Sequence, residues 1–161
     1  MDYHTYYVGE NSILVHNANG KSCSIATNTA DEAKDSLKKA IDKYSGTGEY
    51  KDVGGHHVHA KAGFKGDIKY DSKKGFSISQ EFMESNGLNH QSMTSKQREL
   101  FKELYESGGP NTLDEHTRIA REALKAGGAS DSMISDLINA SLKNLKEQGV
   151  TAPTRIPWYS K

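Results

Sequence analysis

The regular spacing of apolar residues in the second half of the chain is the feature that most constrains its fold. Between residues 130 and 149 they recur every three or four positions, as on one face of an α-helix: Met133, Ile134, Leu137, Ile138, Leu142 and Leu145. Two earlier stretches with this spacing begin at Thr94 and Thr112. Each Thr is followed three positions later by Gln97 or Glu115, the pattern of a capping box. The sequence therefore predicts amphipathic helices that pack around a common core.

Two more helices and a β element are expected upstream. Thr29 or Asp31 begins one helix, and Ser77 or Ser79 begins a shorter one. Their apolar residues are Ala33, Leu37, Ala40, Ile41, Tyr44, Phe82 and Met83. The segment between them, residues 49–70, is rich in glycine and typical of a hairpin or loop. We therefore expect an α+β, mostly helical fold, with a small β-hairpin element packed on a bundle of about four to five helices.

Composition narrows the class of protein. The 161 residues suit one compact domain with a short appended segment. Lys+Arg and Asp+Glu both number 21, so the net charge is zero and any basic groove for nucleic acid has to be local. Cys23 is the only cysteine, which excludes internal disulfides and a four-cysteine zinc site. No apolar run approaches the roughly 18 residues of a membrane span, and the N-terminus does not resemble a signal peptide.

A histidine cluster is the main candidate for chemistry. Three of the seven histidines, His56, His57 and His59, lie in the segment GGHHVHAKAGFKG, which also contains Lys61 and Lys65. In an extended strand His57 and His59 share one face, and His56 points to the other. The flanking glycines allow a close approach of backbone and substrate.

Two mechanisms of phosphodiester cleavage fit these residues. In one, imidazoles hold a divalent metal ion (Mg, Mn or Zn) while another His deprotonates the attacking water. In the other, two histidines act as base and acid on an RNA 2′-hydroxyl, and Lys61 or Lys65 stabilises the charged transition state. An incidental surface histidine cluster is the alternative without chemistry.

Gln97 and Arg98 are candidate substrate-binding residues. Placed in the first turn of the predicted Thr94 helix, they would offer backbone N–H groups and a guanidinium to phosphate. A helix cap and a solvated charge explain them equally well. His116, near the start of the next helix, is expected to be a neutral surface residue because the helix dipole disfavours its protonation. Cys23 lies in a linker and is taken as incidental.

The first seventeen residues predict two short strands, Thr5 to Val8 and Ile13 to His16, joined by a turn at Gly9 to Ser12. The segment HTYYVGENSILVHNA resembles the closing end of the intein-like Hint processing domains that precede toxin modules in bacterial polymorphic toxins. The resemblance implies that His16 and Asn17 match the pair that promotes backbone cleavage after Asn. It divides the chain into residues 1–17 as a remnant of that processing domain, 18–48 as a linker and N-terminal helix, and 49–161 as a nuclease toxin domain.

The histidine segment, with LNHQSMTSKQRELF some thirty residues later, resembles the GHH-type toxins grouped with the HNH/endonuclease VII nucleases. In that superfamily a β-hairpin and a helix hold one metal ion, and a His at the end of the first strand is the general base. The resemblance implies that His57 is the base and His56 a metal ligand. His90 is the best candidate for a further ligand, and His59 is the other.

The predicted function is therefore that of an antibacterial effector nuclease, secreted or displayed at the cell surface as part of a larger protein. It would act on DNA or RNA in the cytoplasm of target bacteria, as a monomer, and a cognate immunity protein would neutralise it in the producer. The first alternative is a metal-independent ribonuclease that cuts transfer RNA with a His pair. The second is a non-enzymatic tip of a surface protein.

Overall fold

The computed structural model describes residues 5–8, 13–16 and 44–159, and the chain divides into two units, Met1–Lys43 and Tyr44–Lys161. In the first unit, β1 (Thr5–Val8) pairs antiparallel with β2 (Ile13–His16), and Thr5 lies opposite His16. Both strands were predicted with these bounds. The turn at residues 9–12, the linker with Cys23 and most of the helix predicted from Thr29 or Asp31 lie outside the described residues.

The second unit contains a small antiparallel sheet in the order β3-β5-β4. Its strands are β3 (Thr47–Glu49), β4 (His56–His57) and β5 (Phe76–Ile78). The short helix α2 (Tyr50–Val53) joins β3 to β4, and the 3-10 helix η1 (Lys61–Phe64) follows β4. The hairpin expected within residues 49–70 therefore extends further, because the partner strand of β4 lies at residues 76–78.

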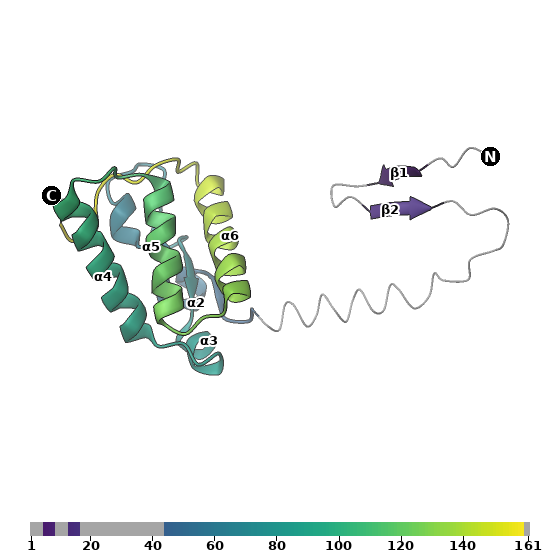
Figure 1. The fold of residues 1–161 in the computed structure, drawn as a ribbon, viewed down its shortest axis with the longest axis horizontal. Helices are drawn as coiled ribbons and strands as arrows, with labels where there is room; N and C mark the ends of the chain where they lie inside the picture. The colour runs from purple at the N-terminus through teal and green to yellow at the C-terminus, as the bar shows by residue number, and fades with distance from the viewer. Residues whose placement is uncertain (1–4, 9–12, 17–43, 160–161) are drawn as a thin grey trace. The chain divides into compact units, whose positions relative to one another are not determined.

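Four longer helices follow the sheet: α3 (Gln80–Ser85), α4 (His90–Ser107), α5 (Leu113–Ala126) and α6 (Asp131–Glu147). Ser79, Thr112 and Ser130 cap α3, α5 and α6, because each side chain accepts a hydrogen bond from a backbone N–H of the first turn. In Figure 1, α4, α5 and α6 lie side by side as one layer. The predicted mostly helical α+β fold is confirmed.

The predicted start of α4 is wrong. The helix begins at His90, capped by Asn89, whose side chain accepts a hydrogen bond from Ser92 N–H. Thr94 therefore lies inside the helix and forms no capping box. Gln97 and Arg98 also lie well inside the helix, where backbone N–H groups bond to carbonyls of the preceding turn and are not available to a phosphate.

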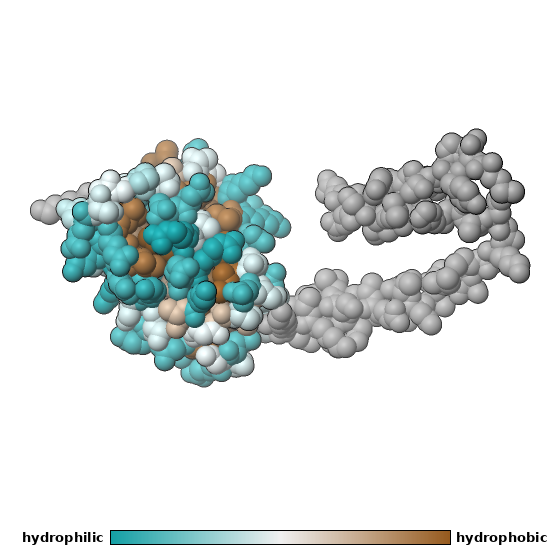
Figure 2. Space-filling model, viewed as in Figure 1, coloured by the Kyte–Doolittle hydropathy of each residue, from teal (hydrophilic) through white to brown (hydrophobic). Residues whose placement is uncertain are grey.

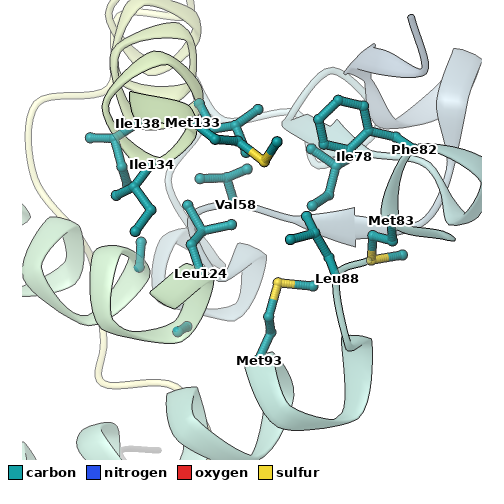
Figure 3. Close-up of a cluster of buried hydrophobic side chains, with 13 residues drawn as sticks. Val58, Ile78, Phe82, Met83, Leu88, Met93, Leu124, Met133, Ile134 and Ile138 are labelled. Atoms are coloured by element: carbon teal, nitrogen blue, oxygen red, sulfur yellow. The ribbon is translucent and has the colours of Figure 1, made fainter. Parts of the chain in front are cut away.

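The core joins the sheet to the helices. Figure 3 shows Val58 and Ile78 from the sheet region facing Leu124 of α5 and Ile134 and Ile138 of α6, all of them buried. Burying an aliphatic side chain of this size stabilises a fold by about 1.5–3 kcal/mol. The outer face of the helical layer is mostly hydrophilic, and hydrophobic residues lie in the grooves between the helices (Figure 2). This core fixes β4 and the start of α4 relative to each other.

The folded unit begins before the boundary predicted at residue 49. Tyr44 packs against the core, stacks on Phe82 with ring centroids 6.4 Å apart, and donates a hydrogen bond to Asp136. Thr47–Glu49 pairs with β5. These residues therefore belong to the compact unit. In the part of the chain that the structure describes, no helix has the length and apolar character needed to cross a membrane.

Candidate active site

Strand β4 presents His56 and His57 at the edge of the sheet, opposite Ile78 and Ser77 of β5. Gly55, directly before the strand, has a φ of 74°, and a Cβ there would overlap the carbonyl oxygen of Ile78. Only glycine lets the backbone pass this close to β5 in a left-handed conformation. The glycine before the histidines is therefore required by the strand that carries them.

Both histidines line a pocket of about 240 Å³. Its other lining residues come from α2, the η1 region, α4 and the C-terminal tail: Tyr50, Gly55, Ala60, Lys61, Ala62, His90, Thr94, Gln97 and Trp158. Five of the residues predicted from the sequence thus share one cavity. A neighbouring pocket of about 380 Å³ is larger and is lined by Lys61, Ala62, Phe64, Lys65, Gly66, Tyr70 and Ser72. We assign the chemistry to the smaller pocket because it contains the imidazoles.

The His57 ring is held in one tautomer. Its Nε2 lies 2.9 Å from the carbonyl oxygen of Ser72. A carbonyl only accepts hydrogen bonds, so Nε2 carries the proton and donates it, and Nδ1 of the neutral ring keeps a lone pair. An imidazole oriented through one nitrogen, with the other able to accept a proton, is the usual arrangement of a general base.

Packing fixes the plane of the His57 ring. Tyr50 stacks on it with ring centroids 4.4 Å apart. Gly75 lies so close that a Cβ there would be 2.9 Å from Cδ2 of His57. Burial lowers the pKa of His57, the hydrogen bond to Ser72 acts in the opposite direction, and the charge of Lys61 lowers the pKa further. The ring is therefore neutral near pH 7, as a base has to be.

His56 and His90 approach each other edge to face, with ring centroids 5.1 Å apart. His56 is buried, whereas His90 is exposed at the first position of α4. The Gln97 amide nitrogen lies 3.5 Å from His56 Nε2 and 3.4 Å from the Val58 carbonyl oxygen. Burial, together with the charges of His90 and His57, lowers the pKa of His56 to about 3. His56 is thus a neutral imidazole, the form that binds metal ions.

The predicted cations occupy three different places. Lys61 lines the pocket, and its Nζ lies 5.3 Å from the centroid of the Tyr50 ring. Lys65 lines only the neighbouring pocket. Arg98, exposed on α4, lies with its guanidinium 5.7 Å from the centroid of the Trp158 ring at the rim of the site. Of these three residues, Lys61 is the one placed beside the imidazoles.

His59 does not share a face with His57. Its side chain is 3% exposed, with Nδ1 2.7 Å from Ser141 Oγ and Nε2 3.0 Å from Thr117 Oγ1. The Thr117 hydroxyl donates to the Leu113 carbonyl, so it accepts from His59 Nε2, and Nδ1 accepts from Ser141. The strand ends at His57, so the alternation of faces does not continue to His59. Both ring nitrogens of His59 are occupied, and the residue lies outside the pocket lining.

His116 is a buried residue, and its predicted surface position is wrong. The side chain is 1% exposed, packs against Phe101 with ring centroids 4.8 Å apart, and donates from Nε2 to Asn111. Burial lowers its pKa to about 4, while Glu115 acts in the opposite direction. The ring is neutral as predicted, but the cause is burial in the core, not a helix dipole at the surface.

Two imidazoles of this pocket lie close enough together to be considered as ligands of one metal ion. Among the described residues, no group of three His, Cys, Asp or Glu side chains is arranged to hold an ion. His56 and His90 are the pair that approaches closely, and His57 commits one nitrogen to Ser72. Imidazole donors without a carboxylate suit Zn²⁺ better than Mg²⁺, so of the three predicted ions the pair fits zinc best.

Four residues of this site were not predicted from the sequence. Tyr50 stacks on His57, the Ser72 carbonyl orients its ring, Gly75 leaves room for it, and Trp158 forms part of the pocket wall. A backbone carbonyl leaves no mark in a sequence. Trp158 had one signal, since it is the only tryptophan of the chain.

No protein-family model, curated protein sequence or solved structure matches this chain.

Proposed function

We propose that the Tyr44–Lys161 unit cleaves phosphodiester bonds of nucleic acid, with His57 as the general base. One observation carries the proposal: the Ser72 carbonyl holds His57 Nε2–H and leaves Nδ1 as a proton acceptor, on a residue that lines one pocket with Lys61 and two further imidazoles. Base, charge-stabilising group and candidate acid are thereby gathered in one cavity.

The chemical step follows from these positions. His57 Nδ1 takes a proton from a water or a ribose 2′-hydroxyl, whose oxygen attacks phosphorus, and the bond to the leaving oxygen breaks. Lys61 stabilises the negative charge that builds on the phosphate oxygens. His90, exposed at the opening of the pocket, donates a proton to the leaving oxygen. Lys65, in the adjoining pocket, binds the next phosphate of the strand.

A bound metal ion would add Lewis-acid chemistry to this step. His56 and His90 would hold it, and it would polarise a phosphate oxygen and acidify a bound water. The Gln97 amide N–H faces His56 Nε2, so a metal ion bound to that nitrogen would replace this contact, and Gln97 is a positioning residue of the metal-free site. With a metal ion bound, His90 would be a ligand and would no longer serve as the acid. The two mechanisms thus differ in the role of His90.

The order of elements agrees with the resemblance to the GHH-type nucleases. β4 ends in the two histidines, β5 is its antiparallel partner, and a helix follows. On this basis we propose that the domain is an effector toxin delivered by a larger secreted protein, and that an immunity protein blocks it in the producer. A non-enzymatic tip would have no need of an oriented base beside a lysine in a cavity.

Cleavage assays test the proposal. Purified full-length chain is incubated with plasmid DNA and with total RNA, with Mg²⁺, Mn²⁺ or Zn²⁺ and with chelator. We expect cleavage that falls about 10²–10⁴-fold in the His57→Ala variant, the usual contribution of a general base. Lys61→Ala should also lose activity. Lys102→Ala, which removes an exposed lysine of α4 paired with Glu106, should not.

The products separate the two mechanisms. Cleavage of RNA that survives chelator and leaves 2′,3′-cyclic phosphate ends supports the metal-free reaction, whereas loss of activity with chelator supports the metal. A His57→Ala variant that cuts as fast as the parent would refute the assignment of the base. If bacteria that express the chain in their cytoplasm grow normally, the proposal that the domain is a toxin is refuted.

A further inference from the structure

Trp158 is an exposed aromatic residue at the edge of the proposed active site. Its side chain is 48% exposed and lines the same pocket as His56, His57 and Lys61. The mechanism above uses no part of this indole. Of the large exposed hydrophobic residues that the structure describes, Trp158 is the one that lines this pocket, and an aromatic wall beside a few polar groups is typical of a ligand site.

The backbone at Trp158 is in an unfavourable conformation that the neighbouring residues impose. Its φ is 66°, in the left-handed region, and it is the only non-glycine residue of the described chain with a positive φ. A bulky side chain adopts this conformation only where the surroundings impose it, and such residues gather at ligand clamps. Here the neighbours impose it, because Pro157 is fully buried and Tyr159 stacks on Tyr105 with ring centroids 6.0 Å apart.

Helix α4 contacts the Trp158 ring with one aromatic and one charged side chain. Phe101 contacts it edge to face, with ring centroids 5.8 Å apart, and the Arg98 guanidinium lies 5.7 Å from its centroid. The same helix places His90 and Gln97 in the pocket. One helix and the tail therefore hold the indole, the guanidinium and His90, the proposed acid, in a fixed relation.

We propose that Trp158 and Arg98 form a stacking platform for a nucleobase next to the phosphate that is cut, so that the substrate is an unpaired stretch of nucleic acid. The inference rests on the proposed function and specifies its substrate class. A nucleobase has an aromatic face that stacks on Trp, and guanidinium groups bind both bases and phosphates. In a duplex both faces of each base are already stacked, so a base reaches Trp158 only from a single strand, a loop or a flipped position.

Tryptophan fluorescence gives a direct readout, because Trp158 is the only tryptophan of the chain. The full-length His57→Ala protein, or His57→Gln if the first is unstable, is titrated with a single-stranded oligoribonucleotide, the matching oligodeoxynucleotide and the duplex of each. We expect saturable quenching by single strands and a Kd at least about tenfold weaker for duplexes. The ribose and deoxyribose arms show which strand is preferred. No quenching by either single strand would overturn the platform.

Substitutions separate stacking from a structural role. Trp158→Asn tolerates the left-handed backbone but removes the ring, and Trp158→Phe keeps an aromatic face. With anisotropy of a labelled strand, Trp158→Asn should weaken binding roughly 5- to 100-fold, and Trp158→Phe should weaken it less. Arg98→Gln should weaken binding and flatten its salt dependence. Arg118→Gln, at an exposed arginine paired with Glu115 on α5, should do neither. Equal binding by parent and Trp158→Asn would overturn the platform.

The two proposals fail in different ways. Cleavage without quenching of Trp158 would refute the platform and leave the nuclease proposal in place. Quenching by single strands without any cleavage by the parent protein would refute the nuclease and leave a single-strand binding site.

Discussion

His57 and His59 stand two positions apart and have opposite environments. His57 donates from Nε2 to the Ser72 carbonyl and lines the pocket, whereas His59 is enclosed between α5 and α6 with both nitrogens hydrogen-bonded. A catalytic base needs a nitrogen that can exchange protons with substrate. On this ground we place the base at His57 and a structural role at His59, although the sequence pattern treats them alike.

Alanine substitutions at the two histidines should separate activity from stability. His59→Ala leaves a cavity and removes a partner from the buried Ser141 hydroxyl and the partly buried Thr117 hydroxyl, so we expect a loss of roughly 2–4 kcal/mol in the free energy of unfolding. Its activity per folded molecule should stay close to that of the parent. His57→Ala should lose activity, and its loss of stability should be smaller than that of His59→Ala, because it removes one partly buried hydrogen bond instead of two. Urea denaturation followed by Trp158 fluorescence measures the first quantity, and the cleavage assay the second. A fully folded His59→Ala protein without activity would contradict this division.

Helix α4 carries much of the site, so the position at which it begins matters for function. His90, Thr94, Gln97 and Arg98 recur at three- and four-residue steps, and Phe101 continues the same face toward Trp158. The Asn89 side chain caps the helix directly before His90. The cap therefore stabilises the helix and holds the turn that places His90 opposite His56.

Removal of this cap should cost both stability and activity. Asn89→Ala is expected to lower the free energy of unfolding by about 1 kcal/mol and to reduce cleavage severalfold, because the first turn frays. Ser130→Ala removes the cap of α6, a helix without a residue in the pocket, and should lower stability by a similar amount without loss of cleavage. Thr94→Ala should lower stability by less than about 0.5 kcal/mol. Thermal denaturation and initial cleavage rates measure these effects. A larger loss of stability in Thr94→Ala than in Asn89→Ala would indicate that Thr94 caps the helix, as the sequence predicted.

At the scale of the whole molecule, the buried histidines make the fold sensitive to acid. Burial lowers the pKa of His59 to about 3 and that of His116 to about 4, and both rings pack among core residues. The unfolded chain binds protons at these side chains near pH 6.5, whereas the folded chain does so only at much lower pH. The contribution of these two neutral rings to the free energy of unfolding is therefore fully present above pH 6.5. It is lost as the pH falls from 6.5 toward the pKa values of the folded state.

The free energy of unfolding should thus fall on acidification by roughly 1.4 kcal/mol per pH unit for each of these histidines. Urea denaturation at intervals from pH 7.5 to pH 4.5 measures the slope. In His116→Gln, the new amide can still donate to Asn111, but the side chain no longer titrates. The free energy of unfolding should then fall by about 1.4 kcal/mol less per pH unit, which corresponds to one proton. A stability that is unchanged down to pH 4.5 would mean that the two rings are protonated without cost in the folded state.

Many helices and strands could be predicted from the sequence because their formation depends mainly on residues that are close together in the chain. The three- and four-residue spacing of Ile134, Leu137 and Ile138 indicated α6. Thr112 was predicted as the cap of α5, and Ser79 was one of the two residues predicted to begin α3. The two N-terminal strands were also predicted with their bounds. Helix periodicity, capping and short hairpins are local properties, so a few consecutive residues are enough to determine them.

From the sequence by itself we predicted that the histidine pair behind two glycines is the chemical centre, but only the tertiary structure decided which residues surround it. Residues 76–78 form a strand because β3 and β4 pair with them. Tyr50 and Ser72 contact His57 from other segments, and Trp158 joins the pocket from the C-terminal tail. His57 faces a cavity while His59 enters the core, because β4 ends between them. These contacts depend on which surfaces the core brings together, and the energy that selects them is shared among many residues far apart in the sequence.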